Sequence, residues 1–225
     1  MKIQFLGHSA FYLETEKFKA LIDPFLQNGI TKATVSDFEE LDYIFVTHGH
    51  GDHVGDTLEL AEKTGATVIL NHELAHHLGK TGIKLHSMHI GGRISFDFGR
   101  VKMTPALHGS SIVIDGELKE GGNPCGFIIE VEGKKIYHAG DTGLTLDMTL
   151  LEVEAIDLAL LPIGGNFTMD VEDAVRAVSF IKPKKVIPMH YDTFPVIKAD
   201  VQTFKDAVSA MTEVIILKGD AIYEL

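Results

Sequence analysis

THGHGDHVGD, residues 47–56, holds three histidines and two aspartates within ten positions, with a glycine on each side of His50. So many ionisable side chains are poor core material, because burying them without partners would cost several kcal/mol. His48 and His50 are two residues apart, so on an extended segment their side chains point the same way. Imidazole and carboxylate groups without thiolate suit zinc, manganese, iron or nickel. The segment therefore predicts a metal site.

A short apolar run, YIFVT at residues 43–47, leads directly into this segment and is typical of a strand buried on both faces. One cluster cannot fill two coordination spheres, so we expect further ligands from elsewhere in the chain. Three polar residues each follow the end of an apolar strand: His108, Asp141 and His190. The repeated order of strand and then ligand predicts that all three lie at one edge of a sheet.

The rest of the chain favours an α/β layered fold, in which strands alternate with helices in the second half. One predicted helix covers residues 171–181, with Asp170 as its N-cap. At 225 residues the chain is long enough for one large domain or two small ones, and we expect a single domain over residues 1–225. Residues 109–125 contain four glycines and a proline, and we expect them to form a mobile flap over a site.

Composition restricts the location and the partners. The sequence shows no apolar run of about 18 residues that would span a membrane, and no signal peptide. The single cysteine, Cys125, cannot form an internal disulfide, so we expect a cytoplasmic protein. The net charge of −12 disfavours extended duplex nucleic acid, whereas a small anionic substrate is compatible because bound metal reverses the local field. A homo-oligomer is a further candidate assembly.

Seven of the polar residues follow one another in a fixed pattern: His48, His50, Asp52, His53, His108, Asp141 and His190. This pattern resembles that of the metallo-β-lactamase superfamily, in which His-x-His-x-Asp-His is followed by distant His, Asp and His. The motifs span most of the chain, so they are far more specific than a lone pair of histidines. The resemblance implies a four-layer αββα sandwich with a binuclear metal centre at one edge.

Position by position, the resemblance also implies two sets of ligands. One metal would be bound by His48, His50 and His108. The other would be bound by Asp52, His53 and His190, with Asp141 bridging the two. Two cations about 3.5–4 Å apart lower the pKa of a water between them, and the resulting bridging hydroxide attacks an electrophilic carbon or phosphorus.

The resemblance favours hydrolysis over other chemistry in the superfamily. Di-iron redox relatives have glutamate where this chain has His50. The branch with a cysteine ligand fits poorly because Asp141 already occupies the shared metal position, so Cys125 reads as a packing residue. Overall, the chain is most similar to the short UlaG-like hydrolases, with which it shares GHSAF at 7–11, IDPF at 22–25 and GGNFTMD at 164–170. That group includes an ascorbate-phosphate lactonase, and the wider superfamily includes phosphodiesterases acting on cyclic nucleotides and RNA.

Two residues outside the ligand set are candidates for contact with substrate. His8 lies in a turn between two predicted strands, where it is either a surface histidine or a proton donor beside the metals. We predict a catalytic role for His8 and for Asp52, and a substrate contact for Asn166. Three other histidines read as ordinary residues on a helix surface: His72, His76 and His77.

The sequence therefore predicts a hydrolase with two divalent ions, which are zinc, manganese or nickel. The expected substrate is a small anionic ester, with a phosphodiester such as a cyclic nucleotide or short RNA first and a sugar-phosphate lactone second. A non-catalytic, metal-dependent binding protein is the alternative from a different class.

Overall fold

The chain divides into two compact units in the computed structural model, which describes residues 1–225. Unit 1 consists of Met1–Ile90, Gly109–Pro124 and Leu217–Leu225. Unit 2 consists of Gly91–His108 and Cys125–Ile216. Each unit has a seven-stranded sheet with helices of its own, so the predicted α/β class is confirmed. The expectation of one domain over residues 1–225 stays a prediction.

The sheet of unit 1 has the order β16-β1-β2-β3-β4-β5-β6. Its strands are β1 (Lys2–Phe5), β2 (Phe11–Glu14), β3 (Lys19–Ile22), β4 (Tyr43–Phe45), β5 (Thr67–Asn71), β6 (Leu85–Met88) and β16 (Ile222–Glu224). The pairs from β3 to β6 are parallel, whereas the pairs from β16 to β3 are antiparallel. The loops after the parallel strands β3, β4 and β5 therefore leave the sheet at the same edge.

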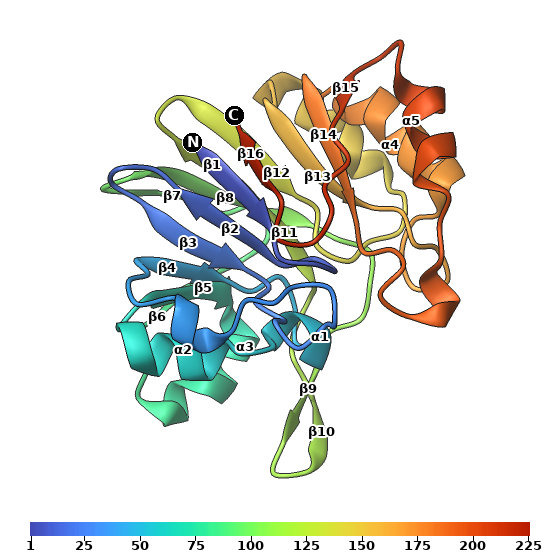
Figure 1. Ribbon diagram of the computed structural model, residues 1–225. Helices are drawn as coiled ribbons and strands as arrows, with labels where there is room; N and C mark the ends of the chain where they lie inside the picture. The colour runs from blue at the N-terminus through green and yellow to red at the C-terminus, as the bar shows by residue number, and fades with distance from the viewer. The chain divides into compact units, whose positions relative to one another are not determined.

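Helices cover one face of this sheet, where Figure 1 shows α2 and α3 packed beside β4, β5 and β6. The helical segments are η1 (Val35–Asp37), α1 (Gly51–Val54), α2 (Thr57–Thr64), α3 (His72–Leu78) and η2 (Gly79–Thr81). Leu60 of α2 and Leu74 of α3 share a buried apolar cluster with Val68 and Leu70 of β5. Val68 and Leu70 are two residues apart, so their side chains lie on the same face of β5, against the helices.

Residues 109–125 contain a β-hairpin, which projects from unit 1 near α1 in Figure 1. The hairpin pairs β9 (Ser111–Ile114) with β10 (Glu117–Glu120). Its apolar cross-strand pair, Val113 and Leu118, is 66% and 71% exposed. The expected flap is therefore a regular hairpin, and its motion stays a prediction.

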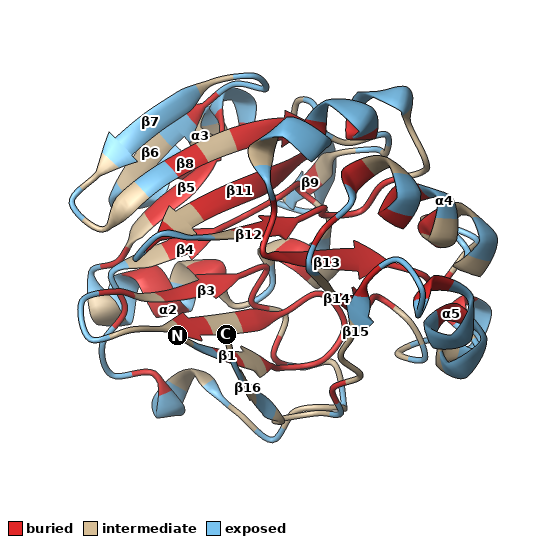
Figure 2. Ribbon diagram, turned by 90° about the horizontal axis from the view of Figure 1, so that it is seen from above, coloured by how far each residue is buried: buried red, intermediate tan, exposed pale blue.

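The sheet of unit 2 has the order β15-β14-β13-β12-β11-β8-β7. Its strands are β7 (Arg93–Phe96), β8 (Gly99–Pro105), β11 (Cys125–Val131), β12 (Lys134–His138), β13 (Leu158–Pro162), β14 (Lys185–Met189) and β15 (Glu213–Val214). The pairs from β12 to β15 are parallel, so the loops after β12, β13 and β14 share one edge. Figure 2 shows β13 buried along its length, as its continuous apolar sequence predicts.

The helical segments of unit 2 are η3 (Leu146–Glu154), α4 (Val171–Ile181), η4 (Pro195–Ile197) and α5 (Val201–Val208). The Asp170 side chain accepts a hydrogen bond from the backbone N–H of Asp173, so the predicted N-cap of α4 is confirmed. Val178 of α4 and Phe204 of α5 are buried in the same apolar cluster as Ala159 and Leu161 of β13. None of the helices is both long and apolar enough to cross a membrane.

Candidate metal centre

In unit 1, the predicted metal-binding segment leaves the sheet at the edge shared by the parallel strands. β4 ends at Phe45, and His48 lies three residues beyond the end of the strand. The first helical turn, α1, then begins at Gly51, so Asp52 and His53 lie on a helix only four residues long. His48 and His53 are fully buried, which is unusual for histidine and requires polar partners.

Asp23 supplies those partners from the loop after β3. Its carboxylate accepts hydrogen bonds from the Thr47 backbone N–H at 2.8 Å and from the Thr47 hydroxyl at 2.7 Å. The same carboxylate lies 2.7 Å from His53 Nδ1, and Thr47 Oγ1 lies 3.0 Å from His48 Nδ1. Asp23 is itself fully buried. Its carboxylate therefore orients His53 by direct contact and His48 through Thr47.

These contacts fix which nitrogen of each ring carries a hydrogen. A carboxylate only accepts, so His53 Nδ1 donates to Asp23 and His53 Nε2 keeps its lone pair. The Thr47 hydroxyl has one hydrogen, which it gives to Asp23, so it accepts from His48 Nδ1. His48 Nε2 therefore also keeps its lone pair. A hydrogen bond from the other ring nitrogen to an acceptor is the usual arrangement of a histidine that binds metal.

The remaining histidine of the segment, His50, lies beside His48. His48 Nε2 and His50 Nδ1 are 3.0 Å apart, and the two ring centres are 4.6 Å apart. Two nitrogens on one tetrahedral zinc, at Zn–N distances near 2.0–2.1 Å, lie roughly 3.3 Å from each other. The spacing of this pair therefore fits two ligands of a single ion.

A glycine lets the loop that carries Asp23 approach the metal-binding segment. Gly55 ends α1 with φ of +43°, and a Cβ there would come within 2.7 Å of Phe25 Cα. Asp56 also holds this loop, because its backbone N–H donates to the Pro24 carbonyl and its carboxylate accepts a hydrogen bond from the Leu26 backbone N–H. The glycine of the sequence HVGD thus allows the close contact that brings Asp23 to His53.

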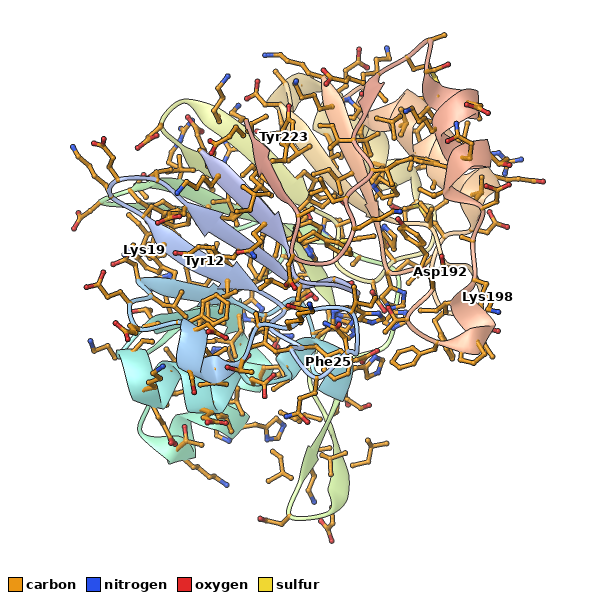
Figure 3. The ribbon with its side chains drawn as sticks, in the orientation of Figure 1. Tyr12, Lys19, Phe25, Asp192, Lys198 and Tyr223 are labelled. Atoms are coloured by element: carbon orange, nitrogen blue, oxygen red, sulfur yellow. The ribbon has the colours of Figure 1, made fainter.

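His8 lies in the turn between β1 and β2 and is fully buried, so the reading as a surface histidine is wrong. Its Nε2 lies 3.2 Å from Asp52 Oδ2, and its ring packs edge-on against the rings of His53 and Phe25. Figure 3 shows Phe25 beside α1, where the metal-binding segment turns. His8 also has a φ of +53°, a left-handed conformation that non-glycine residues adopt only when the surroundings impose it.

In unit 2, the other three predicted ligands meet at the ends of the strands. Asp141 Oδ2 lies 2.9 Å from His190 Nε2 and 3.6 Å from His108 Nε2. Asp141 and His190 are buried, and His190 has a left-handed φ of +55°. A single carboxylate oxygen within reach of two imidazole nitrogens is suited to bridging two ions. The predicted grouping of these three residues at one edge is therefore confirmed within unit 2.

Backbone contacts hold this trio in place. The Thr142 hydroxyl accepts from the Leu107 backbone N–H, and the Gly143 N–H donates to the Leu107 carbonyl. The loops that carry His108 and Asp141 are therefore tied to each other. Gly164, in the loop after β13, packs so closely that a Cβ there would collide with the His190 carbonyl oxygen.

Two further residues of unit 2 differ in their suitability for contact with substrate. Asn166 is exposed, two residues beyond Gly164, and has a left-handed φ of +54°. Its place in the loop beside His190 is compatible with a substrate contact, which stays a prediction. His138 is buried at the end of β12, where its Nδ1 accepts from the Gly140 N–H. That bond supports the turn that leads to Asp141.

Asp23 is not among the site residues that the sequence predicts. The signal was present in IDPF, where an aspartate directly follows an apolar strand, as the predicted ligands do. Its role needs the positions of Thr47 and His53, which are 24 and 30 residues away along the chain. A pattern based on spacing alone could not connect them.

Asp23→Asn tests this role. The amide donates where the carboxylate only accepts, so the variant disfavours the ring tautomers that leave both Nε2 atoms available. We expect metal affinity to fall about 10- to 100-fold, as is usual for loss of such a partner. Competition with a chromophoric chelator measures this. Affinity equal to that of wild type would show that Asp23 stabilises the fold without orienting ligands.

Comparison with known proteins identifies the family. Residues 19–191, which run through both units, match the model of the β-lactamase superfamily domain. The chain is 60% identical over 223 residues to a UPF0173 metal-dependent hydrolase of Alkaliphilus metalliredigens, covering 99% of each chain. A relative of the same name from Carboxydothermus hydrogenoformans is 53% identical over 212 residues, covering 94% of this chain and 93% of the relative.

The solved structures agree. A metallo hydrolase from the hyperthermophilic archaeon Ignicoccus hospitalis is 38% identical and superposes with a TM-score of 0.89, covering 100% of this chain and 98% of the other. The resemblance to the metallo-β-lactamase superfamily that the histidine pattern predicted is thereby confirmed. This chain belongs to the UPF0173 family of metal-dependent hydrolases, within the β-lactamase superfamily.

Proposed function

We propose that the chain is a binuclear metal-dependent hydrolase. His48, His50 and His108 bind one ion, whereas Asp52, His53 and His190 bind the other. Asp141 bridges the two. The observation that carries the proposal is the Asp23 network, in which the Nδ1 atoms of the buried His48 and His53 contact Thr47 and Asp23, so that each Nε2 keeps its lone pair.

The donor set fits divalent transition metals. It contains imidazole and carboxylate groups and no thiolate, because the single cysteine, Cys125, is a buried residue of β11. Zinc, manganese and nickel all accept such ligands. Asp141 supports a pair of ions, since its Oδ2 lies within 3.6 Å of a nitrogen from each proposed set, His108 and His190.

The bound ions supply an acidified water as nucleophile and polarise the oxygen of the substrate. The residues of the chain do the rest. The contact of His8 Nε2 with Asp52 Oδ2, at 3.2 Å, orients Asp52 as a ligand, and His8 is also placed to give a proton to a departing alkoxide. Asn166 carries an amide on an exposed loop, where it hydrogen-bonds an oxygen of the substrate.

A small anionic ester is the substrate class that fits best, with a phosphodiester such as a cyclic nucleotide or short RNA first. Two divalent ions create a local positive field within a chain of net charge −12, so anions bind at the centre and are repelled elsewhere. A sugar-phosphate lactone, which also yields an anionic product, is the second choice. The whole-chain charge argues against an extended duplex.

An activity screen tests the proposal. The metal-loaded chain is incubated with bis-para-nitrophenyl phosphate, cyclic nucleotides, short RNA and lactones, in parallel with manganese, zinc and nickel. We expect turnover of the phosphodiesters, with loss of turnover in Asp141→Asn. Turnover of lactones alone would replace the phosphodiesterase assignment by a lactonase. No turnover of any substrate at full metal occupancy would instead indicate a metal-dependent binding protein.

A further inference from the structure

A histidine of α3 lies beside a histidine that follows β6, on the surface of unit 1. His72 is the first residue of α3, and His89 directly follows β6. β5 and β6 run parallel with Asn71 opposite Met88, so the residues that follow, His72 and His89, are neighbours. Their ring centres are 5.4 Å apart, with an angle of 33° between the planes.

A ring-centre distance of 5.4 Å is compatible with two imidazoles on one metal ion. With Zn–N distances near 2.0–2.1 Å and tetrahedral angles, the centres of two coordinating imidazoles lie roughly 5 Å apart. Both side chains are exposed, so an ion can reach them and water can fill its remaining positions. Neither ring belongs to the proposed centre.

His76 is a candidate third donor, one helical turn along α3. His76 is four residues after His72, so the two side chains lie on the same face of the helix, and His76 is exposed as well. His77 has a different role, because its Nε2 lies 2.8 Å from the Glu120 carbonyl oxygen and so binds the hairpin. On α3, His77 therefore contacts the hairpin, whereas His72 and His76 are exposed to solvent.

We propose that His72, His76 and His89 form a second, surface site for a late first-row divalent ion such as Zn²⁺, Ni²⁺ or Cu²⁺. Imidazole is the ligand that these ions share, and their affinity for it exceeds that of manganese. The acidic chain attracts cations to its surface at low ionic strength. The site does not depend on the proposed hydrolytic function.

Titration of the metal-loaded chain with Zn²⁺ tests this site. We expect one additional zinc ion per chain, with affinity reduced at least about tenfold in His72→Ala and in His89→Ala, because loss of a direct ligand costs no less than loss of an outer partner. His76→Ala should also weaken binding. His77→Ala is the matched control on the same helix and should leave the additional zinc in place.

A second arm separates this site from the proposed centre. The additional zinc should persist in His48→Ala, and hydrolysis should be unchanged in His72→Ala and His89→Ala. Absence of the additional ion in the wild type, or its survival in either His72→Ala or His89→Ala, would overturn the proposal. Unchanged zinc affinity in His76→Ala would remove the third donor.

Discussion

His48→Ala should lose both metal and activity. The variant removes a proposed direct ligand, whose Nε2 lies 3.0 Å from Nδ1 of His50, the neighbouring residue in the same proposed set. Loss of an outer partner alone costs 10- to 100-fold in affinity, so we expect metal affinity and turnover to fall by more than about 100-fold. Elemental analysis of the dialysed protein and initial rates on a phosphodiester measure both quantities.

The control for this variant is His86→Ala, which removes a half-buried histidine of β6 in the same unit. It should keep its metal and its rate. Thermal unfolding distinguishes a lost ligand from a lost fold, since both variants should remain folded without metal. If His48→Ala retained two ions per chain with wild-type turnover, the ligand assignment would be wrong.

His8→Ala should keep its metal but react slowly. The imidazole of His8 can give a proton to a departing alkoxide. We expect turnover on an unactivated phosphodiester to fall about 10²- to 10⁴-fold, the usual contribution of general acid–base catalysis. The loss should be smaller for a para-nitrophenyl ester, because para-nitrophenolate leaves without being protonated.

His8→Asn is the matched variant for the backbone, since asparagine tolerates the left-handed φ of +53° at this position. It keeps a polar side chain near Asp52 but cannot act as an acid, so it should be as slow as alanine. Recovery of the rate in His8→Asn would show that His8 only positions Asp52. Loss of metal from both variants would make His8 a ligand, a role its distance of 3.2 Å to Asp52 also permits.

The sequence predicted most of the fold because its central strands are apolar and bounded by turn residues. β13 and α4 lie where their patterns place them, and Asp170 caps α4 as expected. Elements with mixed composition were missed. β6, LHSM, carries a histidine and a serine, and β16 is three residues long, so neither has a clear apolar period. The glycines of residues 109–125 favour a loop, so the sequence does not predict the hairpin β9–β10.

The proposed ligands could be selected from the sequence because they follow a recognisable order along the chain. His108, Asp141 and His190 meet at the end of their strands, as the repeated order of strand and ligand indicated. The partners of the ligands could not be predicted in this way. Asp23 acts on His53 and, through Thr47, on His48, a relation set by packing between separate strands. The burial of His8 likewise depends on the turn around it.

The central feature of the proposed centre is that two ions act together in hydrolysis. The most direct test adds zinc or manganese stepwise to the metal-free chain and follows the hydrolysis of bis-para-nitrophenyl phosphate against the ions bound per chain. We predict a rate that stays low at one equivalent and reaches its plateau at two. Full activity at one equivalent, or in the presence of a strong chelator, would contradict a binuclear centre.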